Sequence, residues 1–135
     1  AALSGTALAD YWYRKSVKYG REREAFGKQI LKFQVWQHQF ADLATQIEAS
    51  RQLAYRATDL FNNNQECSRE VSMAKLFCGE TANHVIDRCL QFHGGWGYMD
   101  EYAISRAFRD VRLLTVGAGT SEVMREIIAK MEGLS

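Results

Sequence analysis

Two glycine-rich segments hold the residues best suited to chemistry in this 135-residue chain. The first reads Gln91-Phe92-His93-Gly94-Gly95-Trp96-Gly97-Tyr98, and the second reads Gly117-Ala118-Gly119-Thr120-Ser121-Glu122. Glycine has no Cβ, so clustered glycines let a backbone approach another molecule closely. The second segment precedes an apolar periodic stretch and predicts a helix start, whose free N–H groups favour an anionic or electron-rich ligand. Such clusters are also typical of plain helix–helix turns.

Three cysteines are the next candidates for chemistry. Cys67, Cys78 and Cys89 are an odd number, contain no C-x-x-C pair and are spaced by eleven residues. This spacing places them near one face of a helix, which suits buried free thiols in a reducing compartment. A metal site would need closer spacing and histidine partners. We therefore expect no metal.

Composition narrows the class of protein. The net charge is +1, so no strong field favours nucleic acid or an anionic membrane. No apolar run reaches the length of about eighteen residues that a membrane span needs. No pattern of a signal peptide or other targeting segment is present. We expect a bacterial cytoplasmic or a mitochondrial-matrix protein. Proline is absent, which suits long uninterrupted helices.

Apolar periodicity predicts helices throughout the chain. The expected helices cover residues 3–24, 31–62, 68–92, 103–110 and 121–131, with a turn at residues 26–28 and a helix stop at three asparagines, residues 62–64. The inward positions of the second helix follow a 3-4 spacing and are Phe33, Trp36, Phe40, Leu43, Ile47, Ser50, Ala54, Ala57 and Phe61. Those of the first helix are Leu3, Ala7, Tyr11 and Val17, and those of the third are Val71, Ala74, Cys78, Ala82, Val85 and Cys89.

These helices predict an all-α fold. Sustained period-two alternation is missing, and the connections are short, so we expect an up-and-down four-helix bundle with an additional short helix. We expect residues 1–135 to form a single domain. The chain starts on apolar residues without a clear helix cap, which favours a domain of a longer polypeptide.

Five motifs in order resemble the C-terminal helical domain of the acyl-CoA dehydrogenase family. They are Arg21-Glu22-Arg23-Glu24-Ala25-Phe26-Gly27-Lys28-Gln29-Ile30, Phe33-Gln34, the segment from Gln91 to Tyr98, Arg109-Asp110, and the segment from Gly117 to Glu122. The resemblance covers essentially the whole chain. It implies a FAD flavoprotein of fatty acid metabolism that removes hydrogen from an acyl-CoA thioester, usually as a homotetramer.

The resemblance assigns cofactor roles to residues near the first glycine segment. Arg23, in the R-x-x-F-G motif with Phe26, corresponds to an arginine that reaches the FAD pyrophosphate of a neighbouring subunit. A planar guanidinium matches phosphate oxygens well, although a cation at a helix C-terminus is also favourable without any ligand. Gln34 corresponds to a glutamine near the adenine end, with Phe33 beside it. The Q-x-x-G-G segment, Gln91, Gly94 and Gly95, approaches the diphosphate and ribose in the family.

The second glycine segment corresponds to the flavin and substrate side. Thr120 and Glu122 match positions near the flavin of the domain's own subunit, and Ala118 and Gly119 match the substrate side. The resemblance implies that the Ala118 N–H binds the thioester carbonyl oxygen, which would acidify the α-proton as an oxyanion hole does. His93 stands where many members have phenylalanine, and we interpret it as structural.

The catalytic carboxylate of many family members is replaced here. In the family a glutamate removes the substrate α-proton while a β-hydride moves to the flavin, and many members place that glutamate where this chain has Ala118. The segment around Ala118 resembles the isovaleryl-CoA branch, whereas the first glycine segment resembles the long-chain branch. Both branches carry the base on the first helix of this domain. In this protein the corresponding position would lie just upstream of Ala1. We therefore expect no catalytic residue in this chain and no activity from it alone. Glu101 and Glu122 match no family base.

Two other functions remain open on the sequence. The bundle could be a non-catalytic module that associates with itself, or the domain of an acyl-CoA oxidase-like flavoenzyme. For a dehydrogenase the expected partners are an acyl-CoA, a second copy of the chain in a dimer or tetramer, and an electron-transfer flavoprotein.

Overall fold

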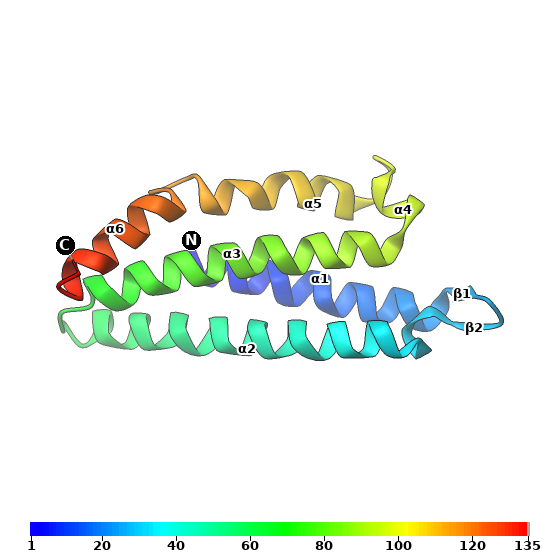
Figure 1. The fold of residues 1–135 in the computed structure, drawn as a ribbon, viewed down its shortest axis with the longest axis horizontal. Helices are drawn as coiled ribbons and strands as arrows, with labels where there is room; N and C mark the ends of the chain where they lie inside the picture. Colours follow the sequence, from blue (N-terminus) through cyan, green and yellow to red (C-terminus); the bar gives the residue numbers. More distant parts are fainter. Residues whose placement is uncertain (135) are drawn as a thin grey trace.

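Three long antiparallel helices form the body of the molecule. The computed structural model describes residues 1–134, in which α1 spans Ala2–Glu22, α2 Gln34–Asn62 and α3 Ser68–His93. After them come α4 (Gly95–Tyr98), α5 (Ala103–Val111), a 3-10 turn η2 (Arg112–Thr115) and α6 (Ser121–Met131). In Figure 1, α5 and α6 follow one another along α3 and complete the fourth position of the bundle. The predicted all-α, up-and-down bundle is confirmed.

The connection between α1 and α2 contains a small hairpin that the sequence did not predict. Strands β1 (Glu24–Ala25) and β2 (Lys28–Gln29) pair antiparallel, and the 3-10 turn η1 (Ile30–Lys32) follows. Phe26 and Gly27 form the tip with φ of 52° and 79°, the left-handed pair of a tight two-residue hairpin. The predicted turn is confirmed, but α1 ends earlier than expected and α2 begins later. Strands of two residues are too short to show an alternation.

The core joins α1, α2, α3 and α5. Its buried members are Ala9, Leu43, Ile47, Ala82, Val85, Ile86, Cys89, Ile104, Ala107 and Val111. The predicted stripe on α2 is buried from Phe40 to Ala57, but its last position is wrong: Phe61 is 70% exposed and Leu60 is 6% exposed. Steps of three and four residues both fit a helix stripe, so spacing alone does not separate these two. Val71, expected inside on α3, is also exposed.

The buried face of α1 differs from the predicted one. Leu3 and Tyr11 are exposed, and Ala7 is too. The helix instead buries small residues, namely Gly5, Thr6, Ala9, Ser16 and Gly20. A Cβ on Gly20 would lie 2.5 Å from the Phe92 ring, which shows how closely α1 approaches α3. The prediction followed large apolar residues, whereas close helix packing selects small ones.

The cysteines are free thiols, as expected. Cys78 and Cys89 are completely buried on α3, and burial raises the pKa of Cys89 to about 11. Cys67 is half-buried just before α3 and does not share their surroundings. Within residues 1–134, no cluster of histidine, cysteine or carboxylate side chains could hold a metal ion. The same residues include no helix long and apolar enough to cross a membrane.

Candidate functional site

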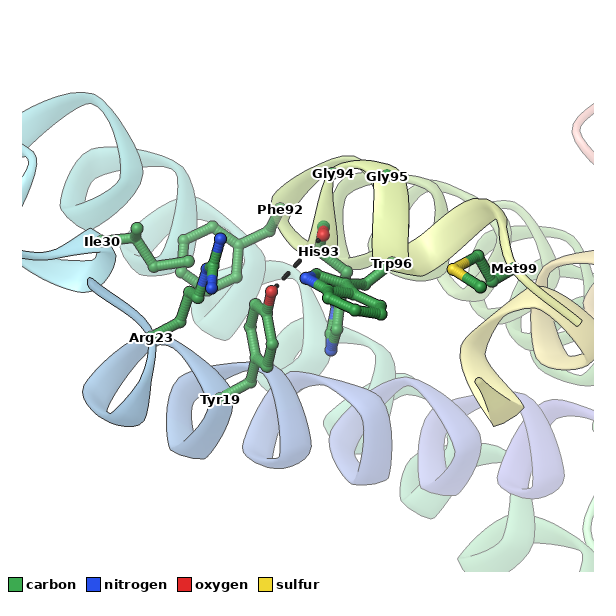
Figure 2. A pocket seen from close by; sticks show the side chains of 9 residues that line it. All are labelled: Tyr19, Arg23, Ile30, Phe92, His93, Gly94, Gly95, Trp96 and Met99. Carbon is green, nitrogen blue, oxygen red and sulfur yellow. Dashed lines mark hydrogen bonds between the residues drawn. The ribbon is translucent and has the colours of Figure 1, made fainter. Parts of the chain in front are cut away.

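A pocket of about 460 Å³ opens at the hairpin end of the bundle. It is lined by Tyr19, Arg23, Ile30, Phe92, His93, Gly94, Gly95, Trp96 and Met99 (Figure 2). The pocket brings together three of the predicted cofactor residues, Arg23, Gly94 and Gly95, which lie far apart in the sequence. The lining contains one permanent cation and no carboxylate. Such a donor set suits an anion.

Arg23 contributes the positive charge. Its backbone closes α1, because its N–H donates to the Tyr19 carbonyl at 2.8 Å, and its own carbonyl accepts from Ile30 at 2.9 Å. These two bonds fix the residue between helix and hairpin. Figure 2 shows the guanidinium between Ile30 and Tyr19, beside the Phe92 ring. No carboxylate in residues 1–134 forms an ion pair with it, so its donors remain available to an external anion.

Gly94 makes the sharp turn between α3 and α4. Its φ of 59° and ψ of −139° lie in a region that only glycine adopts readily. The turn is closed by its N–H, which donates to Gln91 at 3.0 Å, and by its carbonyl, which accepts from Gly97 at 2.9 Å. Apart from the residues adjacent in sequence, a Cβ on Gly94 or on Gly95 would meet no atom of residues 1–134 within 4 Å. The conformation explains the glycine at 94, and the open space in front of both leaves room for a ligand.

A stacked pair forms one wall of the pocket. The rings of Tyr19 and His93 lie 4.3 Å apart and are inclined by 20°. His93 Nδ1 lies 2.7 Å from the Cys89 carbonyl, so this nitrogen carries the proton in the neutral ring. Burial lowers the pKa of His93 below its ordinary value. The ring is therefore a neutral, fixed part of the wall near neutral pH, in accord with its predicted structural role.

The other predicted cofactor residues of this end lie outside the pocket. Phe26 stands at the hairpin tip, is 96% exposed and meets the edge of Phe33 at 6.3 Å between ring centres. Gln34 is the exposed first residue of α2, and Gln91 is exposed on the last turn of α3. The hairpin, the start of α2 and the end of α3, which carry these residues, lie at the same end of the bundle (Figure 1). They are not part of the pocket lining.

The second predicted cluster lies beyond the far end of α5. Thr120 and Glu122 line a separate hollow of about 340 Å³ with Glu80, Asn83, Arg112, Thr115, Val116 and Ser121. Thr120 caps α6 as predicted, because its hydroxyl accepts from the Val123 N–H at 3.3 Å. The carboxylate of Glu122 is hydrogen-bonded by its own backbone N–H and by Thr120, which lowers its pKa. A lowered pKa makes Glu122 a poor proton acceptor.

Ala118 holds an unusual backbone conformation between η2 and α6. Its φ is 55°, and that of Gly119 is 97°. The left-handed region costs a residue with a Cβ on the order of 1 kcal/mol. The residue is exposed, and its N–H has no acceptor within residues 1–134. This N–H therefore remains available as a hydrogen-bond donor.

The chain is thus an all-α bundle with a pocket that suits an anion beside the Gly94-Gly95 turn, and with a backbone N–H at Ala118, just before α6, that has no acceptor within residues 1–134. A family described as "Acyl-CoA dehydrogenase, C-terminal domain" matches residues 1–132. The chain belongs to this family.

Relatives agree with this assignment. Caffeyl-CoA reductase-Etf complex subunit CarC of Acetobacterium woodii is 40% identical over 87% of this chain and 31% of its own length. The mitochondrial long-chain specific acyl-CoA dehydrogenase of Rattus norvegicus is 38% identical over 92% of the chain and 29% of its own length. A crystal structure of acyl-CoA dehydrogenase from Geobacillus kaustophilus superposes with a TM-score of 0.95 at 36% identity, over 97% of this chain and 34% of that one. The chain thus spans about a third of the length of these relatives.

Sequence reasoning missed several residues that build the site. Tyr19, Ile30 and Met99 line the pocket, and Lys75 contacts the Ala118 segment. The signal for Tyr19 is its position one helical turn before Arg23. The signal for Lys75 is its charge among the small buried residues of α3.

Proposed function

We propose that this chain is the C-terminal domain of a FAD-dependent acyl-CoA dehydrogenase, and that it supplies cofactor contacts and an oligomer interface. The observation that carries the proposal is the convergence of Arg23, Gly94 and Gly95 on one pocket without a carboxylate. FAD, when bound, would accept the hydride removed from the substrate. The chain's own residues would bind and orient cofactor and substrate.

The donor set of the pocket fits a diphosphate. Arg23 offers a planar fork of N–H donors, and Gly94 and Gly95 leave backbone-lined space opposite it. Phe26, Phe33, Gln34 and Gln91 lie on the elements at the same end of the bundle and would contact the remainder of the cofactor. By the resemblance to the family, this surface would serve a cofactor held mainly by a neighbouring subunit.

The second cluster would serve the cofactor and substrate of the same subunit. The free N–H of Ala118 would hold the thioester carbonyl oxygen, and Gly119 would leave room for the substrate beside it. An N–H donor aimed at a developing oxyanion is worth about a hundredfold to a thousandfold in rate. Thr120 and Glu122 would lie along the flavin. We propose that the base is a glutamate encoded upstream of Ala1, because Ala118 has no carboxylate and the pKa of Glu122 is lowered.

The proposed partners follow from the same reading. They are an acyl-CoA, further copies of the chain in a dimer or tetramer, and an electron-transfer flavoprotein. The name of the relative CarC places that protein in a complex with Etf.

To test the proposal, the full-length protein that carries this domain is purified, and its FAD binding is compared with that of the Arg23→Ala and Arg23→Lys variants. The wild type should contain FAD, and its visible absorbance should bleach on anaerobic addition of an acyl-CoA. Arg23→Ala should weaken FAD binding by about ten- to a hundredfold, because a charge-assisted hydrogen bond is worth about 1.5–3 kcal/mol. Arg23→Lys keeps the charge without the fork and should fall between.

Other outcomes separate the alternatives. Equal FAD dissociation constants in the three proteins, with equal helix content, would make Arg23 a plain helix-end cation. A wild type without flavin would favour a self-associating bundle. Rapid reoxidation of the reduced flavin by oxygen would indicate an oxidase-like enzyme.

A further inference from the structure

One face of α3 holds the segment that leads into the Ala118 turn. Lys75, Gly79 and Asn83 are spaced by four residues and therefore lie on one stripe of the helix. Asn83 Nδ2 donates to the Val111 carbonyl at 3.1 Å, and a Cβ on Gly79 would lie 3.0 Å from the Leu114 carbonyl oxygen. Lys75 Nζ donates to the Gly119 carbonyl. The segment from 111 to 119 thus runs antiparallel to α3 and approaches it at the backbone carbonyls of Val111, Leu114 and Gly119.

Lys75 is the unusual member of this stripe. It is 8% exposed, and no carboxylate within residues 1–134 forms an ion pair with it. Its side chain lines an apolar hollow with Ala54, Ala57 and Ala74. A lysine that only covered apolar surface would carry its ammonium out to water. Here the ammonium instead reaches across from α3 to a single carbonyl in the turn.

The contact between Lys75 and the Gly119 carbonyl lies at the only strained part of the backbone between residues 111 and 119. Ala118 and Gly119 both have positive φ, and the bond from Lys75 fixes the carbonyl that ends this pair. A residue in the left-handed region persists only when its surroundings hold it. Thr120, the cap of α6, follows directly and holds the other side of the turn.

We propose that Lys75 is a positioning residue that keeps the Ala118 N–H aimed at the substrate carbonyl. The substrate in this inference comes from the proposed function, whereas the contact between Lys75 and Gly119 comes from the structure. Lys75 acts by fixing the Gly119 carbonyl, and it touches neither substrate nor cofactor.

The test uses the full-length protein with Lys75→Met, which keeps the apolar stem, and Lys75→Arg, which keeps a cationic donor. Lys130→Met is the matched control, because Lys130 is exposed on α6 and pairs with Glu126 at 2.8 Å. The first readout is amide hydrogen exchange, by mass spectrometry, of peptides that cover residues 113–124. The second is the infrared carbonyl frequency of a bound acyl-CoA labelled with ¹³C at the thioester.

In Lys75→Met, exchange of the hydrogen-bonded amides on either side of the turn, those of Val116, Gly117 and Met124, should rise about fivefold, as expected for one lost hydrogen bond. The red shift of the carbonyl band should shrink, while FAD content and melting temperature stay close to those of Lys130→Met. Lys75→Arg should restore part of both signals. Unchanged exchange, an unchanged carbonyl band, or loss of FAD and fold in both Lys75 variants would overturn the proposal.

Failure of the proposed function would look different. If the wild-type protein bound no acyl-CoA, the carbonyl measurement would fail for every variant, and the assignment of a dehydrogenase would fall. The hydrogen-exchange comparison needs neither FAD nor substrate. It would still decide whether Lys75 holds the Ala118 turn.

Discussion

His93 shows how a single residue can be tied to its surroundings by two separate contacts. Its ring stacks on Tyr19, and its Nδ1 is bound to the Cys89 carbonyl. Water is largely excluded, so the charged ring is disfavoured and the pKa is lowered from 6.5. A neutral ring beside Arg23 avoids adding a second positive charge to the pocket wall.

This burial predicts a pH dependence of stability. The unfolded chain binds a proton at the ordinary pKa of 6.5, whereas the folded chain binds it only at lower pH. Between these two values the unfolded state holds more protons, so stability should fall as the pH drops below about 6.5 and level off below the folded pKa. His93→Phe should remove this part of the pH dependence. Urea denaturation at about pH 7.5 and about pH 5.5 measures it.

The control is His84→Gln, which changes an exposed imidazole on the same helix. It should retain the pH dependence of the wild type. If His93→Phe lost as much stability on acidification as the wild type, the effect would belong to other groups.

Residues that act through a motif could be predicted from the sequence, and residues that act through packing could not. Arg23, Gly94 and Gly95 line one pocket, and they could be predicted because they belong to motifs that occur in the same order as in the family. Tyr19 and Lys75 enter their sites by lying on helix faces whose neighbours come from distant segments. Phe26 and Gln34 stay outside the pocket, because they lie at the exposed hairpin tip and at the exposed first residue of α2.

At the scale of elements, the close approach of α1 to α3 decides the shape of the pocket. Gly20 lets the helix lie against Phe92, and this contact brings Tyr19 and Arg23, on the same and the next turn, to the α3 end. The three long helices could be predicted from the sequence, because their apolar periodicity extends over many residues. The buried face of α1 was predicted wrongly, because its small buried residues contribute little to an apolar pattern and a second set of positions fits the helix period equally well.

Gly20→Ala should destabilise the fold. The new methyl group would lie 2.5 Å from the Phe92 ring, which packs against Trp36, Phe40 and Tyr19 and has little room to move. Overpacking costs about 1–3 kcal/mol, and the better helix propensity of alanine returns about 1 kcal/mol. The free energy of unfolding should therefore fall by up to about 2 kcal/mol, as measured by chemical denaturation.

The matched comparison makes the same change in a Phe92→Leu background. Leucine lacks the outer ring atoms, so Gly20→Ala should cost less there or become stabilising. An equal cost in both backgrounds would show that the Phe92 ring is not the cause.

At the scale of the whole molecule, the two candidate sites lie on different parts of the bundle. The pocket lies at the hairpin end, and the Ala118 turn lies beyond α5 on the way to α6 (Figure 1). Around the pocket, large apolar side chains are left uncovered: Trp96 is 42% exposed, Tyr98 is 86% exposed and Met99 is 41% exposed. Uncovered apolar groups that gather beside a pocket tend to mark interfaces.

We therefore expect the chain to associate with itself through the 91–98 turn and α2. Species heavier than the 15.4 kDa monomer should appear in sedimentation at tens of micromolar, about the concentration at which weak interfaces are populated. Tyr98→Asp places a charge in this surface and should shift the chain toward monomer, because a buried unpaired charge is costly. Leu134→Asp adds the same charge after α6, where Leu134 is 76% exposed, and should leave association unchanged. A strict monomer for the wild type, or equal effects of the two substitutions, would contradict the assignment of the interface to this end.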